Sequence, residues 1–294
     1  MMSGSLVAGL RHLHAVKQLK NTEIYAVADV ETSNIENIEL DAHVKRSIDY
    51  QSIDQTDGLV IVALPHSMLM ECSTHFLKLG NHVLIEKPIC DSYEDAIHLK
   101  ELAETHKVTL MVGHIERFNP AVTMLKSLID EGAFGKVTSL IAKRVGAFPA
   151  QIKDANVIID LAVHDIDIFS YLLGQQPDSV YGNAGRALND GREDYAELFL
   201  TYGDQNGFIQ VNWITPIRIR NIAITGTKGY AELNYMTQEL TFYESNYHND
   251  FDTFGDYIIK FGTPHKRDIQ VEKKEPLGLE LAHFLDCIRT QSSP

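Results

Sequence analysis

An apolar strand that ends on two charged residues and a proline most constrains how this chain folds. The strand covers residues 81 to 85, and Glu86, Lys87 and Pro88 follow it directly. Because proline lacks a backbone N–H and keeps the residue before it out of the helical region, the strand has to end there. Lys87 is thereby placed at the carboxyl end of a strand, where open α/β sheets bind ligands. A lysine there can donate hydrogen bonds or exchange a proton, or it can be an ordinary solvated residue.

Strands and helices alternate on both sides of this segment. Residues 58 to 63 are a continuous apolar run that ends before Pro65, and residues 108 to 113 form another strand. Apolar spacings of three and four predict helices at residues 67 to 79 and 91 to 106. This rhythm is typical of a parallel, doubly wound α/β sheet.

The N-terminal residues carry part of a dinucleotide-binding motif. Gly4 and Gly9 fit the first and third glycines of G-x-G-x-x-G, with Leu6 in the middle position, and a helix is expected to follow as far as residue 20. Asp29 ends a strand and lies about twenty residues after Gly9, where an acid meets the ribose hydroxyls. Such an acid favours NAD over NADP, because a 2′-phosphate would meet like charge. The alternative is a helix start followed by an ordinary aspartate.

The strand that precedes this motif in a Rossmann fold is missing from the sequence. Only Met1, Met2 and Ser3 stand before Gly4, whereas the strand order 3-2-1-4-5-6 makes that strand central. We therefore expect a Rossmann-type sheet that lacks its first strand. We also expect that a form extended by roughly ten residues, enough for a strand and its turn, is more stable and binds NAD more tightly.

The pattern changes near Asn119 and Pro120, which suit the cap and first turn of a helix. We predict a dinucleotide-binding domain over residues 1–118 and a C-terminal domain over residues 119–294. Short links between its strands predict an α+β domain with a large open sheet, mixed or antiparallel. Residues 245 to 275 are expected to be irregular. Strands are expected at 136–144, 179–188, 195–202, 207–215, 221–225, 230–234 and 239–243, and helices at 119–131, 157–173 and 276–289.

Asp160 and His164 carry the chemistry of the predicted second domain. They are four residues apart in a predicted helix, so they share a face. A carboxylate beside a histidine fixes its tautomer and raises its basicity, which suits removal of a hydroxyl proton while hydride leaves for a nicotinamide. An ordinary surface pair is one alternative. A metal site of His164, Asp165 and Asp167 is another, although no second histidine stands at ligand spacing.

Composition limits the partners. The formal net charge of −14 opposes nucleic acids and anionic membranes, and no apolar run approaches the length of a membrane span. Cys72, Cys90 and Cys287 are far apart and read as free thiols of a cytoplasmic protein. Alternating strands such as residues 208 to 213 leave one apolar face of the open sheet, so we expect a homodimer or homotetramer.

Three segments resemble the Gfo/Idh/MocA family of NAD(P)-dependent sugar and polyol oxidoreductases. They are Glu86-Lys87-Pro88 after a strand, Gly113-His114 to Asn119-Pro120, and Asp160-x-x-x-His164-Asp165-Ile-Asp167. The resemblance implies a Rossmann domain followed by a domain with a large open sheet. It implies that His164 is the base, with Asp160 in the catalytic set and Lys87 as hydrogen-bond donor or proton relay. It also places beside the cofactor Ala63, Pro65, Glu86 and His114.

Two further stretches, His114 to Pro120 and Asn212 to Pro216 with Arg220, are similar to members that oxidise UDP-N-acetylglucosamine-type sugars at C3. The implied function is hydride transfer from a secondary hydroxyl of a sugar to NAD. The implied substrate contacts are Lys87, Arg117, Asn119 and His164. Arg117, Arg218 and Arg220 can hold a diphosphate or be surface charges. The alternative function, suggested by Leu6 and the missing strand, is a non-catalytic NAD-binding or regulatory homologue.

Overall fold

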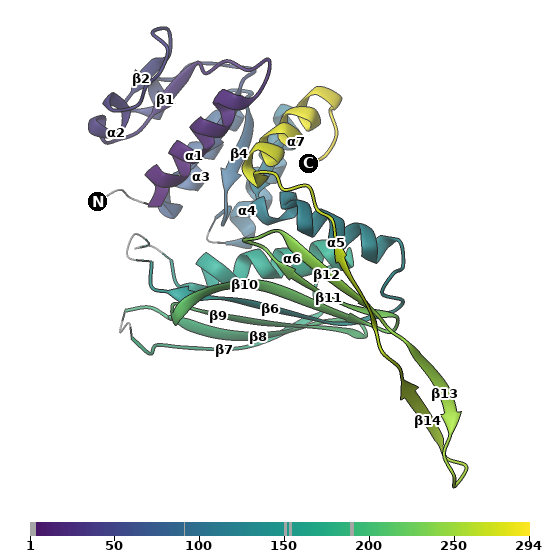
Figure 1. Ribbon diagram of the computed structural model, residues 1–294. Coiled ribbons are helices and arrows are strands. Elements are labelled where there is room, and N and C mark those ends of the chain that lie inside the picture. The colour runs from purple at the N-terminus through teal and green to yellow at the C-terminus, as the bar shows by residue number, and fades with distance from the viewer. Residues whose placement is uncertain (1–3, 91, 150–151, 153–154, 189–190) are drawn as a thin grey trace. The chain divides into compact units, whose positions relative to one another are not determined.

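A computed structural model describes residues 4–90, 92–149, 152, 155–188 and 191–294, and its elements form two compact units (Figure 1). The first unit contains the residues up to Ile115 together with Glu275–Pro294, and the second contains most of the residues from Glu116 to Lys274. The predicted boundary at residue 118 lies close to this division. The last helix was predicted to belong to the C-terminal domain, but α7 (Pro276–Thr290) belongs to the first unit.

The first unit contains the predicted parallel sheet. β3 (Leu59–Val62), β4 (His82–Glu86) and β5 (Leu110–Gly113) pair in that order, and α3 (His66–Lys78) and α4 (Tyr93–His106) connect them. The central strand β4 is buried on both faces, as its continuous apolar run predicts. Residue 91, where the second helix is predicted to begin, lies outside the described residues, and the Ser92 side chain caps α4 by accepting the Asp95 N–H.

A separate two-stranded parallel sheet contains β1 (Ala26–Ala28) and β2 (Lys45–Ser47). Among the described strands, β3 pairs only with β4 and β1 only with β2, so the sheet is divided where the strand predicted to be missing belongs. The predicted fold class, a Rossmann-type parallel sheet followed by a domain with a large mixed sheet, is confirmed. That the first strand is missing stays a prediction. Neither β2 nor the short helix α2 (Thr32–Glu36) was predicted from the sequence.

The predicted glycine turn at the N-terminus is wrong in the described residues. Gly4 is the first residue of α1 (Gly4–Gln18), and Gly9 lies inside that helix with open space where a Cβ would stand. The apolar residues that recur along this segment already satisfy a helical pattern from residue 6 onward. That pattern extends the helix across both glycines, and neither is required for a turn.

The second unit is built on an eight-stranded mixed sheet with the order β15-β12-β11-β10-β6-β9-β8-β7. All neighbouring pairs are antiparallel except β6 and β9. Helices α5 (Pro120–Asp130) and α6 (Val163–Leu173) cover one face (Figure 1). The strands are β6 (Val137–Ala147), β7 (Ser179–Gly185), β8 (Tyr195–Tyr202), β9 (Gln205–Asn212), β10 (Ile214–Gly226), β11 (Gly229–Asn234), β12 (Glu239–Glu244) and β15 (His265–Ile269).

Residues 245 to 275 are not irregular, which corrects the prediction. β13 (Tyr247–Phe251) and β14 (Tyr257–Phe261) form an antiparallel hairpin that extends beyond the end of the sheet (Figure 1), and β15 then returns to pair with β12. Residues two apart on a strand share a face. The exposed apolar side chains of the hairpin therefore lie on one face. These side chains are Tyr247, Phe251, Tyr257, Ile259 and Phe261.

The face of the large sheet opposite the helices has an exposed apolar row. Strand register aligns Tyr181, Phe199, Phe208 and Ile141 across β7, β8, β9 and β6. Their exposed fractions are 76%, 42%, 38% and 51%. Side chains opposite one another on adjacent strands are direct neighbours, so these four residues form one continuous apolar surface, which we call the outer row.

Candidate active site

The carboxyl ends of the three parallel strands bring together most of the predicted cofactor residues. Val62 pairs with Ile85, and Glu86 pairs with Gly113. The residues that follow each strand therefore lie along one edge of the sheet, where ligands bind in this fold. Those predicted to contact the cofactor or the substrate are Ala63, Pro65, Lys87 and His114, with Glu86 at the end of β4 itself.

Asp29 follows β1 directly, as predicted, in the other parallel sheet. Its Oδ1 accepts the Glu31 N–H at 2.9 Å and the Asn34 Nδ2–H at 3.0 Å. Oδ2 accepts no hydrogen bond from any described residue. One carboxylate oxygen is thus held in place, and the other is available to a hydroxyl pair.

The first unit fits a dinucleotide by the chemistry of these groups. Asp29 offers an acceptor for ribose hydroxyls, and the first N–H groups of α1 are the donors that a pyrophosphate requires. When bound, the nicotinamide would supply the hydride acceptor for oxidation of an alcohol.

Two residues that were not predicted from the sequence, His12 and Glu280, lie close to Glu86. His12 on α1, only 3% exposed, places its Nε2 2.6 Å from Glu86 Oε1. Glu280 on α7 is 1% exposed, and neither of its carboxylate oxygens has a hydrogen-bond partner in the described structure. The residue before Lys87 is therefore fixed by a buried histidine and lies within electrostatic range of a buried acid.

Burial and, to a smaller extent, the negative charges of Glu86 and Glu275 together raise the pKa of the Glu280 carboxyl to about 8. A buried carboxylate loses its hydration, and like charges nearby oppose ionisation. Glu280 is consequently protonated at neutral pH, while Glu86 is the acid that pairs with His12.

Asp160 and His164 lie in the second unit, on a continuous helical segment that starts at Ile158 and ends with α6. Asp160 is within a π-helical turn, Ile158–Ala162, and His164 is in the first turn of α6. The π turn is marked by the Val163 N–H, which bonds to the Ile158 carbonyl five residues earlier. Such turns are rare and occur frequently at functional sites. Both side chains are partly exposed, so a ligand can reach them.

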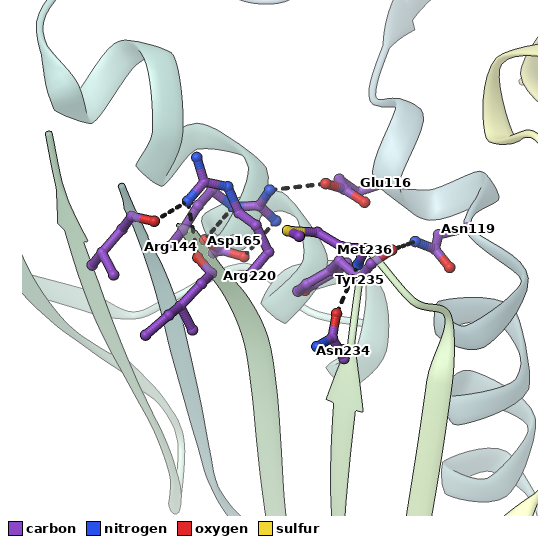
Figure 2. A network of polar contacts seen from close by, with 10 residues as sticks. Glu116, Asn119, Arg144, Asp165, Arg220, Asn234, Tyr235 and Met236 are labelled. Atoms are coloured by element: carbon purple, nitrogen blue, oxygen red, sulfur yellow. Dashed lines mark hydrogen bonds and ion pairs between the residues drawn. The ribbon is translucent and has the colours of Figure 1, made fainter. Parts of the chain in front are cut away.

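Asp165, the neighbour of His164, belongs to a buried ionic network (Figure 2). Arg144 Nε and Nη2 donate to the two Asp165 oxygens at 2.8 and 3.0 Å, and Arg144 Nη1 donates to Glu116 Oε1 at 2.8 Å. The guanidinium also lies 4.8 Å from the centre of the Tyr235 ring. Burial opposes the charge of Arg144, but the two carboxylates outweigh it, so its pKa lies above the usual value. This network anchors the start of α6 to the sheet.

Two predicted substrate contacts also have partners within the protein. Arg117 donates to both Asp167 oxygens, at 2.9 and 2.6 Å, and stacks on Tyr171. Asn119 is 2% exposed: its Oδ1 accepts the Ala121 N–H, which caps α5 as predicted, and its Nδ2 donates to the Tyr235 carbonyl. Contact of either residue with a substrate stays a prediction.

The metal alternative finds no support in the described residues, where no cluster of three metal-ligating side chains is present. Asp165 and Asp167 are each bound by an arginine. No helix in the described part of the chain is long and apolar enough to cross a bilayer.

Comparison with known proteins decides the family. Residues 2–114 match the model of an oxidoreductase family with an NAD-binding Rossmann fold, and residues 122–232 match the GFO/IDH/MocA C-terminal domain. The chain belongs to the Gfo/Idh/MocA family of oxidoreductases. The predicted recognition is thus confirmed, and the order of the two matches follows the order of the two predicted domains.

Among its relatives is UDP-N-acetylglucosamine 3-dehydrogenase of Acidithiobacillus ferrooxidans, 28% identical over 96% of this chain and 87% of that protein. Its solved structure superposes with a TM-score of 0.81, at 22% identity over 96% of this chain and 86% of that one. The scyllo-inositol 2-dehydrogenase (NAD(+)) of Bacillus subtilis is 28% identical over 80% of this chain and 68% of its own. The WlbA dehydrogenase of Bordetella pertussis, solved with NADH and UDP-GlcNAcA, gives a TM-score of 0.71 at 21% identity, over 79% and 72%.

Proposed function

We propose that this Gfo/Idh/MocA oxidoreductase transfers hydride from a secondary hydroxyl of a nucleotide sugar to NAD. The observation that carries the proposal is the Asp160–His164 pair, accessible and placed across a π turn. The proposed residues lie in different units, Lys87 in the first and Asp160 and His164 in the second. Asp29, with one free carboxylate oxygen, supports NAD rather than NADP.

The proposed step needs a base and a hydride acceptor. His164 takes the hydroxyl proton, the C–H bond breaks toward the nicotinamide, and the alcohol becomes a ketone. Asp160 keeps the imidazole basic, and Lys87 donates a hydrogen bond to the developing carbonyl oxygen. The reaction is balanced, since two electrons and one proton leave as hydride and the second proton remains on His164.

A UDP-N-acetylhexosamine oxidised at C3 is the substrate class that we favour, because a relative aligned over nearly the whole chain acts on UDP-N-acetylglucosamine. The three free cysteines among the described residues support a reducing, cytoplasmic setting. The test is NADH formation by the purified protein with UDP-N-acetylglucosamine, UDP-N-acetylgalactosamine, UDP-glucose, inositol and free N-acetylglucosamine. Turnover with only the UDP sugars supports the proposal, and turnover with only inositol overturns the substrate class. NADH binding without turnover on every substrate favours the non-catalytic alternative.

We also propose a homodimer or homotetramer in which the outer row is covered by a second copy of the chain. An exposed apolar surface that runs across four strands of a sheet is typical of an interface. Phe208→Glu is expected to convert the assembly to a 33.0 kDa monomer in light scattering. Thr225→Glu, on the polar part of the same face, is the control and keeps the assembly. A monomeric wild-type protein at micromolar concentration contradicts the proposal.

A further inference from the structure

Three arginines lie close together on the paired strands β6 and β10: Arg144, Arg218 and Arg220. Carboxylates do not balance their charges equally. Arg144 is paired with Asp165 and Glu116 (Figure 2). Arg220 donates only to backbone carbonyls, from its Nη1 to Val145 O at 2.6 Å and to Ile219 O at 2.9 Å. Within the described residues, no carboxylate forms an ion pair with Arg220. A half-buried guanidinium is thus left without a counter-charge.

The surroundings of Arg220 work against its charge. Its pKa falls to about 10, mainly because of burial and then because of the positive charges of Arg144 and Arg218. Asp165 and Asp160 act in the opposite direction without cancelling the effect. Arg220 is still protonated at neutral pH. A cation held in this way lowers the stability of the free protein, and such features are kept where a ligand needs them.

The position of Arg220 connects it to the proposed reaction. It lies close enough to Asp160 for the charge of that carboxylate to shift its pKa. Its cross-strand neighbour on β6 is Arg144, which binds Asp165, the residue after His164. Arg117, by contrast, has a counter-charge, because Asp167 binds it.

We propose that Arg220 binds an anionic group of the substrate, a phosphate or a carboxylate carried by the sugar that is oxidised beside Asp160 and His164. This inference rests on the proposed function and assigns a residue that holds the charged part of the substrate. Planar guanidinium groups bind both kinds of oxyanion with paired hydrogen bonds. Arg220 has one terminal nitrogen, Nη1, committed to the backbone, which fixes the plane of the group and leaves its other donors for the ligand.

The test compares wild-type protein with Arg220→Gln, Arg220→Lys and the surface control Arg289→Gln, which removes the same charge from α7. Binding of UDP, glucuronic acid and neutral N-acetylglucosamine is measured by calorimetry and thermal shift, with and without NADH. We expect Arg220→Gln to weaken binding of the anion by about ten- to a hundred-fold and Arg220→Lys to weaken it less. UDP alone as ligand identifies a phosphate, and glucuronic acid alone identifies a carboxylate.

Stability without ligand gives the second readout. Because Arg220 is an unpaired charge, Arg220→Gln is expected to keep or raise the Tm of the free protein while removing the stabilisation by the anion. A lower Tm with unchanged anion binding would overturn the inference and make Arg220 a purely structural residue. Binding needs no turnover, so anion binding that depends on Arg220 without any dehydrogenase activity would sink the proposed function and leave this site standing.

Discussion

Replacing His164 by alanine is expected to lower kcat for sugar oxidation by about 10²–10⁴, the contribution of a positioned general base. Without the imidazole, the hydroxyl proton has to leave to water while hydride departs. Substrate binding should change little, because the proposed role of His164 is in the transition state. Steady-state kinetics with saturating NAD measure the effect, and a fall in kcat with a stable KM is the expected pattern.

Two comparisons make this prediction specific. Asp160→Asn keeps the shape of the side chain but removes the charge that holds the imidazole basic, so it should lower kcat and shift the acidic limb of the pH profile, where the base becomes protonated, to lower pH. His265→Ala, on the exposed strand β15, is the matched control and should leave kcat intact. Full activity of His164→Ala at every pH would exclude His164 as the base.

Replacing Glu280 by glutamine is expected to stabilise the protein above pH 8. The pKa of Glu280 is about 8 in the folded protein against 4.5 for the ordinary group, so the folded state holds a proton that the unfolded state releases. Stability is therefore lost progressively as pH rises from 4.5 to about 8, and the loss is complete above that value. The shift corresponds to a few kcal/mol, and glutamine, neutral at every pH, removes this dependence.

Thermal unfolding at pH 5 and at pH 8.5, values taken from about the two ends of that window, measures the effect. Glu280→Gln should gain several degrees in Tm at the higher pH, at about 2–4 °C per kcal/mol, and much less at the lower pH. Glu104→Gln, an exposed acid on α4 paired only with Lys100, is the control and should show no such pH dependence. A Tm difference of equal size at both values would contradict the raised pKa.

The elements that sequence predicted well are those whose burial alternates or is continuous. Residues 195 to 202 form β8 with the predicted bounds, because every second side chain enters the core. The hairpin β13–β14 was missed, since both its faces are largely exposed and its apolar residues do not alternate regularly with polar ones. The π turn carries no periodic signal at all, because one bond that spans five residues changes the backbone without changing the apolar pattern.

The site was predicted in part, for a physical reason. Lys87, Asp160 and His164 stand in local motifs, whereas His12 meets Glu86 only because the chain brings distant segments together. Glu280 did leave a signal: it lies on the same helix face as Leu277, Leu281 and Phe284, where a carboxylate on an apolar stripe indicates a buried acid. Asn119 caps α5 as predicted, whereas its contact with a substrate stays a prediction, because a capping amide and a substrate-binding amide look alike in sequence.

The return of the last helix to the first unit also sets the order in which this protein is completed on the ribosome. Domains of a nascent chain usually close from the N-terminus onward. Here α7 packs against α1, and its apolar side chains Leu277, Leu281 and Phe284 belong to the first unit. The packing of α7 against α1 is therefore completed only after Thr290 has been synthesised, when the second unit already has its final strand.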